Sequence, residues 1–302
     1  MPSNDTNRLG ALLTAIGAYS LWTLFPLYFA LLSEVDALEV VAWRILCTLP
    51  FCLVMVVVLR QTADLKAMLT NPRMIAVLTL SGLLIGTNWL LYVLSIMHGH
   101  VLAASLGYYI NPLVNVLAAT LFLRERLTSL QWLAVALAAI GVAVLAWDAL
   151  PTLWISLTLA FSFAGYGLSR KLAPIVPLPG LTVETMVLMI PAIGLLAWTA
   201  SGPEGLSMGS SARISLLMLL AGPISGVPLI MFASAARQLD FSVLGFIQFI
   251  TPTGLFLQGL FLFGEPLKTV QAICFVFIWT AIALFCWDLL RKRSAAARAL
   301  RS

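Results

Sequence analysis

The chain of 302 residues is 61% hydrophobic and only 10% charged, with a mean hydropathy of +1.03. A typical soluble chain is about a quarter charged, so this composition leaves too little polar surface to cover a water-soluble globule. The net charge of +5 does not indicate a nucleic-acid-binding protein, because the basic residues fall in short gaps between apolar segments and in the C-terminal tail. The composition indicates a protein whose main partner is the lipid bilayer.

Ten apolar segments follow one another along the chain, most of them near the roughly 20 residues that a helix needs to cross the hydrocarbon core. They cover residues 9–32, 38–59, 72–97, 101–123, 130–147, 152–170, 181–200, 213–236, 242–263 and 267–289. The short segments of alternating polarity that build membrane β-barrels are absent from the sequence. We therefore expect an all-α integral membrane protein with ten transmembrane helices.

One sequence pattern occurs twice, and the members of each matched pair are 140 residues apart. The pairs are Arg73/Arg213, Gly82/Gly222, Gly86/Gly226, Pro112/Pro252, Glu125/Glu265, Gln131/Gln271 and Trp147-Asp148/Trp287-Asp288. We interpret the chain as two five-helix copies of one unit, residues 8–148 and 149–288, followed by a basic tail at 289–302. An odd number of spans per copy turns the second copy over in the membrane, which predicts a 5+5 inverted repeat.

Lysine and arginine gather in the connections that share one side of the membrane if the N-terminus is cytoplasmic. Arg170 and Lys171 belong to this group, whereas only Arg213 and Lys268 fall in outer connections. Positive connections stay inside, so both termini are expected in the cytoplasm and the basic tail near anionic lipid head groups. The first apolar segment is longer than a signal-peptide core and is expected to be the first span.

Neither a metal site nor a cofactor site is indicated by the sequence. The four cysteines lie within apolar segments at irregular spacing, where cysteine behaves as a small hydrophobic residue. His98 and His100 flank Gly99 without further ligands nearby. No Gly-rich phosphate-binding loop is present, so ATP hydrolysis is not expected.

Pro112 and Pro252 fall in mid-span, where proline removes a helix hydrogen bond and bends the helix. Amide and aromatic side chains accompany them, and transporters built from inverted repeats bind their solutes at this depth. The predicted substrate-binding residues are Tyr19, Trp22, Asn88, Trp89, Tyr92, Tyr108, Asn111, Asn115, Tyr166, Gln248, Phe249 and Thr251. These side chains suit a neutral or zwitterionic organic solute. The alternative is that the polar ones only join helices by hydrogen bonds.

Each copy also carries two glycines four residues apart, Gly82/Gly86 and Gly222/Gly226. Glycines at this spacing let two helix backbones approach closely. The pairs are expected to form packing seams, and a further hypothesis is that helices tilt along these seams during transport.

Arg44 and Glu184 are the charged residues most deeply embedded in apolar sequence. A charge inside the membrane is costly and is therefore a functional candidate, here for coupling transport to an ion such as the proton. The alternative is that each side chain reaches to its nearest interface. Glu125 and Glu265 end their spans, and each is expected to bond the start of the following helix.

The string Gly-Tyr-Tyr-Ile-Asn-Pro-Leu-Val-Asn at 107–115, with Gln-Trp-Leu-Ala-Val at 131–135, resembles the RarD-type members of the EamA family in the drug/metabolite transporter superfamily. Residues 85–90 and 159–168 show the same resemblance, which covers essentially the whole chain. It implies ten helices in a 5+5 inverted repeat, a bacterial cytoplasmic membrane and secondary transport by alternating access. The family commonly has glycine before the glutamate, as in Gly264-Glu265, whereas Arg124 precedes Glu125 here.

The leading hypothesis is a secondary transporter, of the exporter type, for small organic solutes such as amino acids, metabolites or drugs. A membrane channel, a lipid scramblase and an integral-membrane enzyme are the alternatives. An enzyme would need converging nucleophiles, acids or metal ligands, which the spans barely supply. A channel would favour a ring of equivalent residues from several subunits, whereas the pseudo-symmetry here lies within one chain.

Overall fold

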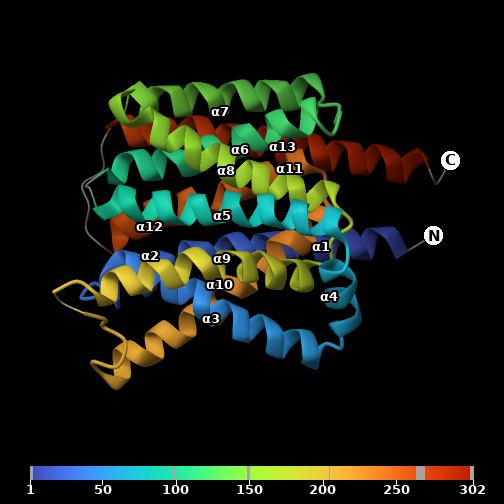
Figure 1. Ribbon diagram of the computed structural model, residues 1–302. Coiled ribbons are helices and arrows are strands. Elements are labelled where there is room, and N and C mark those ends of the chain that lie inside the picture. The colour runs from blue at the N-terminus through green and yellow to red at the C-terminus, as the bar shows by residue number, and fades with distance from the viewer. Residues whose placement is uncertain (1–2, 98–99, 148–149, 204, 263–268, 300–302) are drawn as a thin grey trace.

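The computed structural model is a bundle of helices that run roughly along one direction (Figure 1). It describes residues 3–97, 100–147, 150–203, 205–262 and 269–299, and no strand occurs among them. The helices are α1 (Ser3–Thr23), α2 (Phe25–Ala30), α3 (Ala37–Val58), α4 (Thr62–Leu69), α5 (Pro72–Met97), α6 (Val101–Leu121), α7 (Ser129–Trp147), α8 (Leu153–Leu172), α9 (Pro177–Ala200), α10 (Ala212–Gln238), α11 (Phe241–Gln248), α12 (Ile250–Phe261) and α13 (Thr269–Ala299), with a 3-10 turn η1 (Leu150–Thr152). The expected all-α class is confirmed.

Nine helical segments in the described ranges are long and apolar enough to cross a membrane. Two of them, Arg8–Ala30 and Phe241–Phe261, each join two consecutive helices into one span. Helix α6 has 21 residues and lies among these segments, but it is not one of the nine. The protein is thus a multi-pass membrane protein, and the expected number of ten spans stays a prediction with which α6 agrees.

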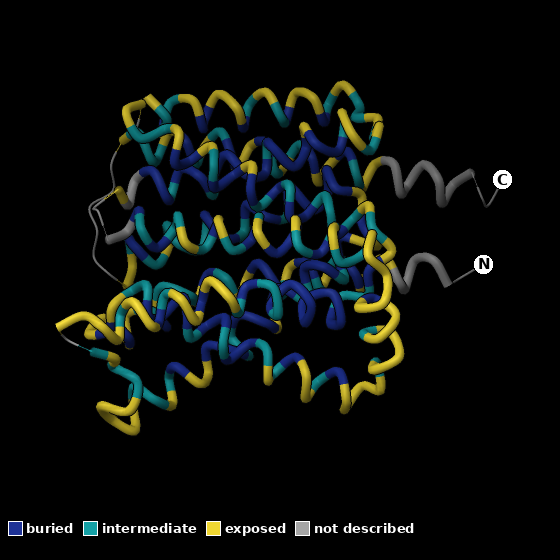
Figure 2. Tube along the Cα trace, in the orientation of Figure 1, coloured by how far each residue is buried: buried dark blue, intermediate teal, exposed yellow. Residues whose placement is uncertain are grey.

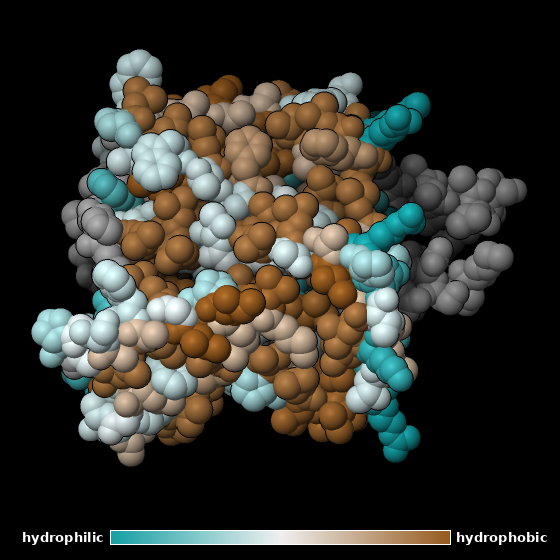
Figure 3. Space-filling model, in the orientation of Figure 1, coloured by the Kyte–Doolittle hydropathy of each residue, from teal (hydrophilic) through white to brown (hydrophobic). Residues whose placement is uncertain are grey.

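The outer surface of the bundle is apolar where lipid would surround it. Buried residues lie along the inner faces of the helices, and exposed residues lie along the outer faces (Figure 2). Hydrophobic side chains cover most of the visible face, whereas hydrophilic ones gather at the end beside α4, on the right (Figure 3). Ile190 is 79% exposed and Val276 67% exposed, although both are aliphatic. Such a surface is typical of a protein that contacts lipid.

Helix α4 was not expected from the sequence. It follows the second span and has 8 residues, so it is too short to cross the membrane. Met68 is buried, and Asp64 and Lys66 are partly or fully exposed. The helix lies at the end of the bundle where α1 begins and α13 ends (Figure 1).

Two spans are broken near their middle or end. Helix α1 gives way to α2 at Leu24, and α11 gives way to α12 at Phe249. Pro26 and Pro252 lie in the first turns of α2 and α12, where a missing N–H costs no helix hydrogen bond. Pro112, in contrast, lies inside a helix that continues past it. The two matched prolines therefore occupy different settings.

The most extensive packing joins helices α1–α7 with helices α8–α13. Helix α7 lies along α13, α3 along α9 and α6 along α11, so equivalent helices of the two halves meet (Figure 1). By the 140-residue offset, α1, α3 and α5 correspond to α8, α9 and α10. The contact of α5 with α8 is therefore matched by the contact of α10 with α1, and the contact of α5 with α9 by that of α10 with α3. Helix α1 starts at the end of the bundle where α8 finishes (Figure 1). The exchanged contacts are expected for any two units related by a pseudo-twofold axis, and the opposite directions of α1 and α8 are expected for an inverted repeat.

The first glycine pair lies where α5 packs on α9. A Cβ atom on Gly82 would lie 3.3 Å from the carbonyl oxygen of Glu184, so two helix backbones meet at this glycine. A Cβ atom on Gly86 would lie 2.6 Å from a methyl carbon of Leu188. Gly86 therefore makes room for a side chain of the neighbouring helix.

The second pair repeats this arrangement where α10 packs on α3. A Cβ atom on Gly222 would overlap the carbonyl oxygen of Cys47, so the backbones are in contact there. A Cβ atom on Gly226 would lie 3.0 Å from the ring of Phe51. Both glycine pairs thus lie in packing seams. At Gly86 and Gly226, however, the nearest atoms of the neighbouring helix belong to a side chain, so the expected contact between two backbones is wrong at these two positions. Helix tilting along the seams stays a prediction.

Candidate functional site

A cavity of about 820 Å³, including the part that opens to the surface, lies in the interior of the bundle. Its walls come from α1, α2, α3, α5 and α6 and from α8, α10, α11 and α12. Most of the lining residues lie at the middle of their helices or toward the end of the bundle that carries residues 31–36 and 201–211. The cavity therefore lies between the two sets of helices, at membrane depth and toward one end.

Nine of the twelve predicted substrate-binding residues line this cavity. They are Tyr19, Trp22, Asn88, Trp89, Tyr92, Tyr108, Asn111, Gln248 and Thr251. They come from both halves of the sequence, and the break between α11 and α12 brings Gln248 and Thr251 to the same wall. The structure thus gathers them in one place, and their role in binding remains a prediction.

Asn115, Phe249 and Tyr166 do not line the cavity. The Nδ2 atom of Asn115 donates a 2.6 Å hydrogen bond to Oε1 of Gln248. Phe249 is 1% exposed, and Tyr166 is fully buried against Phe232. These three residues support the wall from behind, which corrects their prediction as lining residues.

Two asparagines bring polar atoms to the wall. Asn88 donates from Nδ2 to the Leu159 carbonyl at 2.8 Å and to the Ser162 hydroxyl at 3.1 Å, so α5 is joined to α8. Asn111 is 3% exposed, and its buried Oδ1 atom accepts no hydrogen bond in the described residues. A buried amide without a partner costs about 1–3 kcal/mol. The Oδ1 atom of Asn111 therefore has an unmet hydrogen-bonding capacity beside the cavity.

Arg44 of α3 also lines the cavity and is only 4% exposed. Its Nε atom donates a 3.0 Å hydrogen bond to the Ser225 hydroxyl in α10. The guanidinium carbon lies 4.8 Å from the ring centre of Trp89 and 5.4 Å from those of Phe25 and Phe29. The Arg44 side chain is enclosed by the bundle. The alternative expectation, that it reaches to the membrane interface, is therefore wrong.

Several lining residues were not predicted. These are Phe25, Pro26, Phe29, Ala104, Gly107, Leu159, Phe163, Leu229 and Leu255. Most are apolar, so nothing in their type separates them from residues that face lipid or pack between helices. The short helix α2, which follows the break at Leu24, places Phe25 and Phe29 on the cavity wall. The run Phe25-Pro26 was the available signal for that break.

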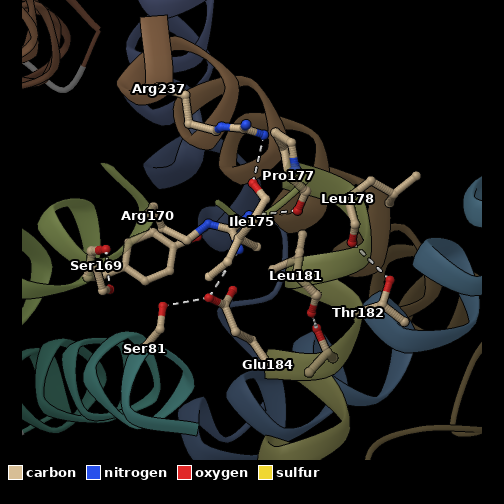
Figure 4. A network of polar contacts seen from close by, with 12 residues as sticks. Ser81, Ser169, Arg170, Ile175, Pro177, Leu178, Leu181, Thr182, Glu184 and Arg237 are labelled. Carbon is tan, nitrogen blue, oxygen red and sulfur yellow. Dashed lines mark hydrogen bonds and ion pairs between the residues drawn. The ribbon is translucent and has the colours of Figure 1, made fainter. Parts of the chain in front are cut away.

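Glu184 lies away from the cavity in a buried polar network (Figure 4). Its Oε1 atom accepts a 2.5 Å hydrogen bond from the Ser81 hydroxyl and lies 3.4 Å from Nη1 of Arg170. Both charged side chains are 1% exposed. Arg170 was expected in a cytoplasmic connection, but it lies at the core and pairs with Glu184, because a buried charge needs an opposite charge and hydrogen bonds. Glu184 does not reach the interface.

The same network joins four helices near the start of α9. Nη2 of Arg170 donates a 2.6 Å hydrogen bond to the Pro177 carbonyl, and Arg237 of α10 donates to the Ile175 carbonyl at 2.9 Å (Figure 4). Ser81 contributes from α5. These bonds hold the residues between α8 and α9 in place.

Glu125 links the two halves at the end of the bundle opposite the cavity. Its carboxylate accepts hydrogen bonds from the backbone N–H groups of Phe241 at 2.6 Å and Ser242 at 3.1 Å, and from the Ser242 hydroxyl at 2.6 Å. It therefore caps α11, and the expectation that it bonds the following helix, α7, is wrong. Glu265 lies outside the described residues.

Further contacts close this end around the connection between α10 and α11. Arg8 forms a 3.0 Å ion pair with Asp240, and Lys171 donates a hydrogen bond to the Leu239 carbonyl. Phe241 is fully buried. The cavity is thus separated from this end by packed side chains and by bonds between helices of both halves.

Glu39 has a matching role at the other end and was not predicted. It is fully buried and accepts hydrogen bonds from the backbone N–H groups of Ser207 at 3.0 Å and Met208 at 3.1 Å. Trp43 donates to it from Nε1 at 3.2 Å. The carboxylate ties the connection before α10 to the start of α3.

Within the described ranges, no group of three or more His, Cys, Asp or Glu side chains could hold a metal ion. His98, half of the discounted His-x-His pattern, lies outside those ranges. The cavity wall itself carries amide, hydroxyl, aromatic and guanidinium groups.

The comparisons agree with the architecture. The model of the EamA-like transporter family matches residues 8–147. An uncharacterized transporter of Pseudomonas aeruginosa is 44% identical over 275 residues, which cover 91% of this chain and 92% of the relative. The chain belongs to the EamA-like transporter family. Protein RarD of Escherichia coli is 41% identical over 284 residues, covering 93% of this chain and 95% of RarD.

These matches identify a RarD-type member of the drug/metabolite transporter superfamily, as the sequence predicted. The chloramphenicol-sensitive protein RarD of Pseudomonas aeruginosa is 31% identical and covers 93% of this EamA chain and 96% of the relative. A solved structure titled "Crystal structure of protein" superposes with a TM-score of 0.69 at 19% identity, covering 91% of this chain and 96% of that one. This last likeness concerns the fold alone.

Proposed function

We propose that this EamA-family membrane transporter is a secondary carrier that moves small organic solutes, in the direction of export, by alternating access. The observation that carries the proposal is the cavity between helices α1–α7 and α8–α13, which approaches one end of the bundle and is closed toward the other. A cavity at membrane depth with aromatic walls and a few polar groups is typical of small-molecule sites.

The repeat units offer a mechanism for alternation. We infer that residues 8–148 and 149–288 form two inverted units. Helices 140 residues apart in sequence make matching contacts, α5 with α8 and α10 with α1, and α1 and α8 run in opposite directions (Figure 1). Inverted units can swap their conformations, which would close the present opening and open the opposite end. In this proposal the closed end, with Glu125 and Asp240, faces the cytoplasm, and the protein resides in the bacterial inner membrane with both termini inside.

Reconstitution into liposomes tests the carrier function. Purified protein should give saturable uptake of a specific solute from a panel of amino acids, other metabolites and amphenicol drugs. Empty liposomes and a variant with Leu255→Trp serve as controls, because the Leu255 side chain lines the cavity and a larger side chain would narrow it. Electrical conductance would support a channel instead, and transbilayer movement of labelled lipid would support a scramblase.

Proton coupling through Glu184 is a separate part of the proposal. Glu184 is buried between α5, α8 and α9, and its Oε2 atom has no hydrogen-bond partner among the described residues. If the carboxylate carries the proton, Glu184→Gln should transport without dependence on an imposed pH gradient. A gradient effect that survives this substitution would restrict Glu184 to its pairing with Arg170.

A further inference from the structure

We propose that Arg44 is the anion-binding residue of the cavity, and that the solute carries a carboxylate or a comparable anionic group on an aromatic or aliphatic body. The inference rests on the proposed transport function and narrows the class of solute. It allows a zwitterion, such as an amino acid, and disfavours solutes that are only neutral or only cationic.

The first step concerns the unused donors of Arg44. A guanidinium has five N–H donors and cannot lose its charge in a protein. The Nε donor bonds the Ser225 hydroxyl at 3.0 Å, but neither Nη group donates to any atom of the described chain. Because Arg44 lines the cavity, these four remaining donors are available to a molecule within it.

The second step concerns charge balance. None of the cavity-lining residues is acidic, and in the described part of the chain no carboxylate lies within 4.0 Å of Arg44. The rings of Phe25, Phe29 and Trp89 offset part of the cost of burial, at about 0.5–2 kcal/mol for each such contact. A charge at this depth still favours an opposite charge nearby. The cavity thus attracts anions.

Arg170 provides an internal comparison. It is 1% exposed, close to the 4% of Arg44, but it lies 3.4 Å from Glu184 and also bonds the Pro177 carbonyl. Where a buried arginine only holds helices together, this chain supplies a carboxylate. Arg44 has no such carboxylate and lines the cavity, which points to an anion that binds there reversibly.

The rest of the wall fits the body of such a solute. A guanidinium binds a carboxylate through two parallel hydrogen bonds, and this geometry orients the anion. The rings of Trp22, Phe25 and Phe163 line the same cavity and offer apolar surface to the remaining part. Asn111 lines the same cavity, and its Oδ1 atom has no partner in the described chain.

The rival role for Arg44 is a brace between α3 and α10 through Ser225. A brace would affect stability without any preference for the charge of a bound molecule. Ligands matched in shape and different in charge separate the two roles, because only an anion site distinguishes an acid from its amide.

The test uses the full chain in lipid nanodiscs at pH 7 and three probes, 3-phenylpropionate, 3-phenylpropionamide and 3-phenylpropylamine. Isothermal titration calorimetry should show the acid binding at least about 10-fold more tightly than the amide, the size of one charge-assisted hydrogen bond. Arg44→Gln should remove the preference, and Arg44→Lys should keep part of it. Arg213→Gln, at an exposed arginine outside the cavity, should behave as wild type.

Ser225→Ala removes the brace but leaves the charge, so the preference for the acid should persist. Equal affinity for acid and amide in the wild type, or no binding of the acid at low millimolar concentration, would overturn the proposal. The wild-type comparison decides the question even if Arg44→Gln fails to fold.

Flux measurements in proteoliposomes separate this inference from the proposed function. Binding of the acid without flux of any organic acid or amino acid would support the anion site at Arg44 and refute the carrier function. Flux of neutral solutes that is unchanged in Arg44→Gln would support the carrier function and refute the anion site at Arg44.

Discussion

Glu125, in the connection that follows α6, and Phe241, at the start of α11, are joined by a hydrogen bond of 2.6 Å. The carboxylate satisfies backbone N–H groups that have no partner within the helix, and it lies at the positive end of the helix dipole. This single side chain therefore connects helices α1–α7 with helices α8–α13 at the closed end of the cavity.

Glu125→Gln should weaken this connection. An amide accepts hydrogen bonds less strongly than a carboxylate and carries no charge for the dipole, so the free energy of unfolding should fall by about 0.5–2 kcal/mol. Thermal unfolding in detergent measures the change. Glu34→Gln, at an exposed glutamate, is the control and should leave the melting temperature unchanged. Identical melting of both variants would contradict the capping role.

Arg170 and Glu184 should show strong coupling in a double-mutant cycle. Arg170→Met or Glu184→Leu alone leaves one buried charge without its partner, which costs about 3–5 kcal/mol. The double variant should lose much less than the sum of the two. The same cycle on Arg8 and Asp240, whose side chains are 44% and 58% exposed, should give about 0–1 kcal/mol. Additive losses at Arg170 and Glu184 would show that the pair contributes nothing.

Gly222→Ala should destabilise the protein, because the added Cβ atom would overlap the carbonyl oxygen of Cys47. Backbone cannot move aside as a flexible side chain can, so a loss of about 1–3 kcal/mol is expected. Gly194→Ala is the matched control, since nothing lies within 4 Å of its Cβ position. That variant should be as stable as wild type or up to about 1 kcal/mol more stable. Chemical denaturation compares the two.

Arg124→Gly should stabilise the protein. Arg124 has a φ of 55°, in the left-handed region that costs a residue with a side chain about 1–2 kcal/mol and costs glycine almost nothing. A rise of about 0.5–1 kcal/mol in the free energy of unfolding is expected after the greater freedom of glycine in the unfolded chain is counted. Arg126→Gly, at an exposed residue without a positive φ, should not share the gain. A melting temperature that falls in Arg124→Gly would refute this reading.

Asn111 and Asn115 should separate binding from stability, although they lie four residues apart on α6. Asn111 lines the cavity, whereas Asn115 donates to Gln248 behind the wall. Asn111→Ala should weaken solute binding at nearly unchanged stability. Asn115→Ala leaves Gln248 without its partner and should cost about 1–3 kcal/mol of stability. Titration calorimetry and thermal unfolding on both variants would show the reverse pattern if the assignment is wrong.

The architecture was largely predictable because membrane spans have a composition and a length that show in the sequence. The ten apolar segments correspond to the observed helices, and the glycine pairs lie at helix contacts. What each glycine meets was not predictable, because Gly226 faces the Phe51 ring and Gly222 faces backbone although both belong to one spacing motif. Helix α4 was missed because its residues are too polar for a span. The break at Phe249 lies close to Pro252, where a bend was expected, whereas the break at Leu24 was missed although Pro26 follows it.

The cavity was predictable only for its polar and larger aromatic residues. Asn88 and Asn111 stand out in apolar sequence, whereas Phe29 and Leu229 do not, because their position relative to lipid depends on helix rotation. The partner of Glu184 was missed for a different reason. Arg170 lies at the end of an apolar segment, where arginine normally marks an interface, and its burial follows from the return of the chain through Ile175 and Pro177.

The packing of α1–α7 mainly on α8–α13 has a consequence for biogenesis. During translation, α3 enters the bilayer before either α9 or α10 exists, so the surface around Cys47 that later receives Gly222 first faces lipid. Insertion and assembly must therefore be separate events. A truncated product that stops after α7 would lack most of the helix contacts of the full chain, so its helices would stay loosely associated in the bilayer.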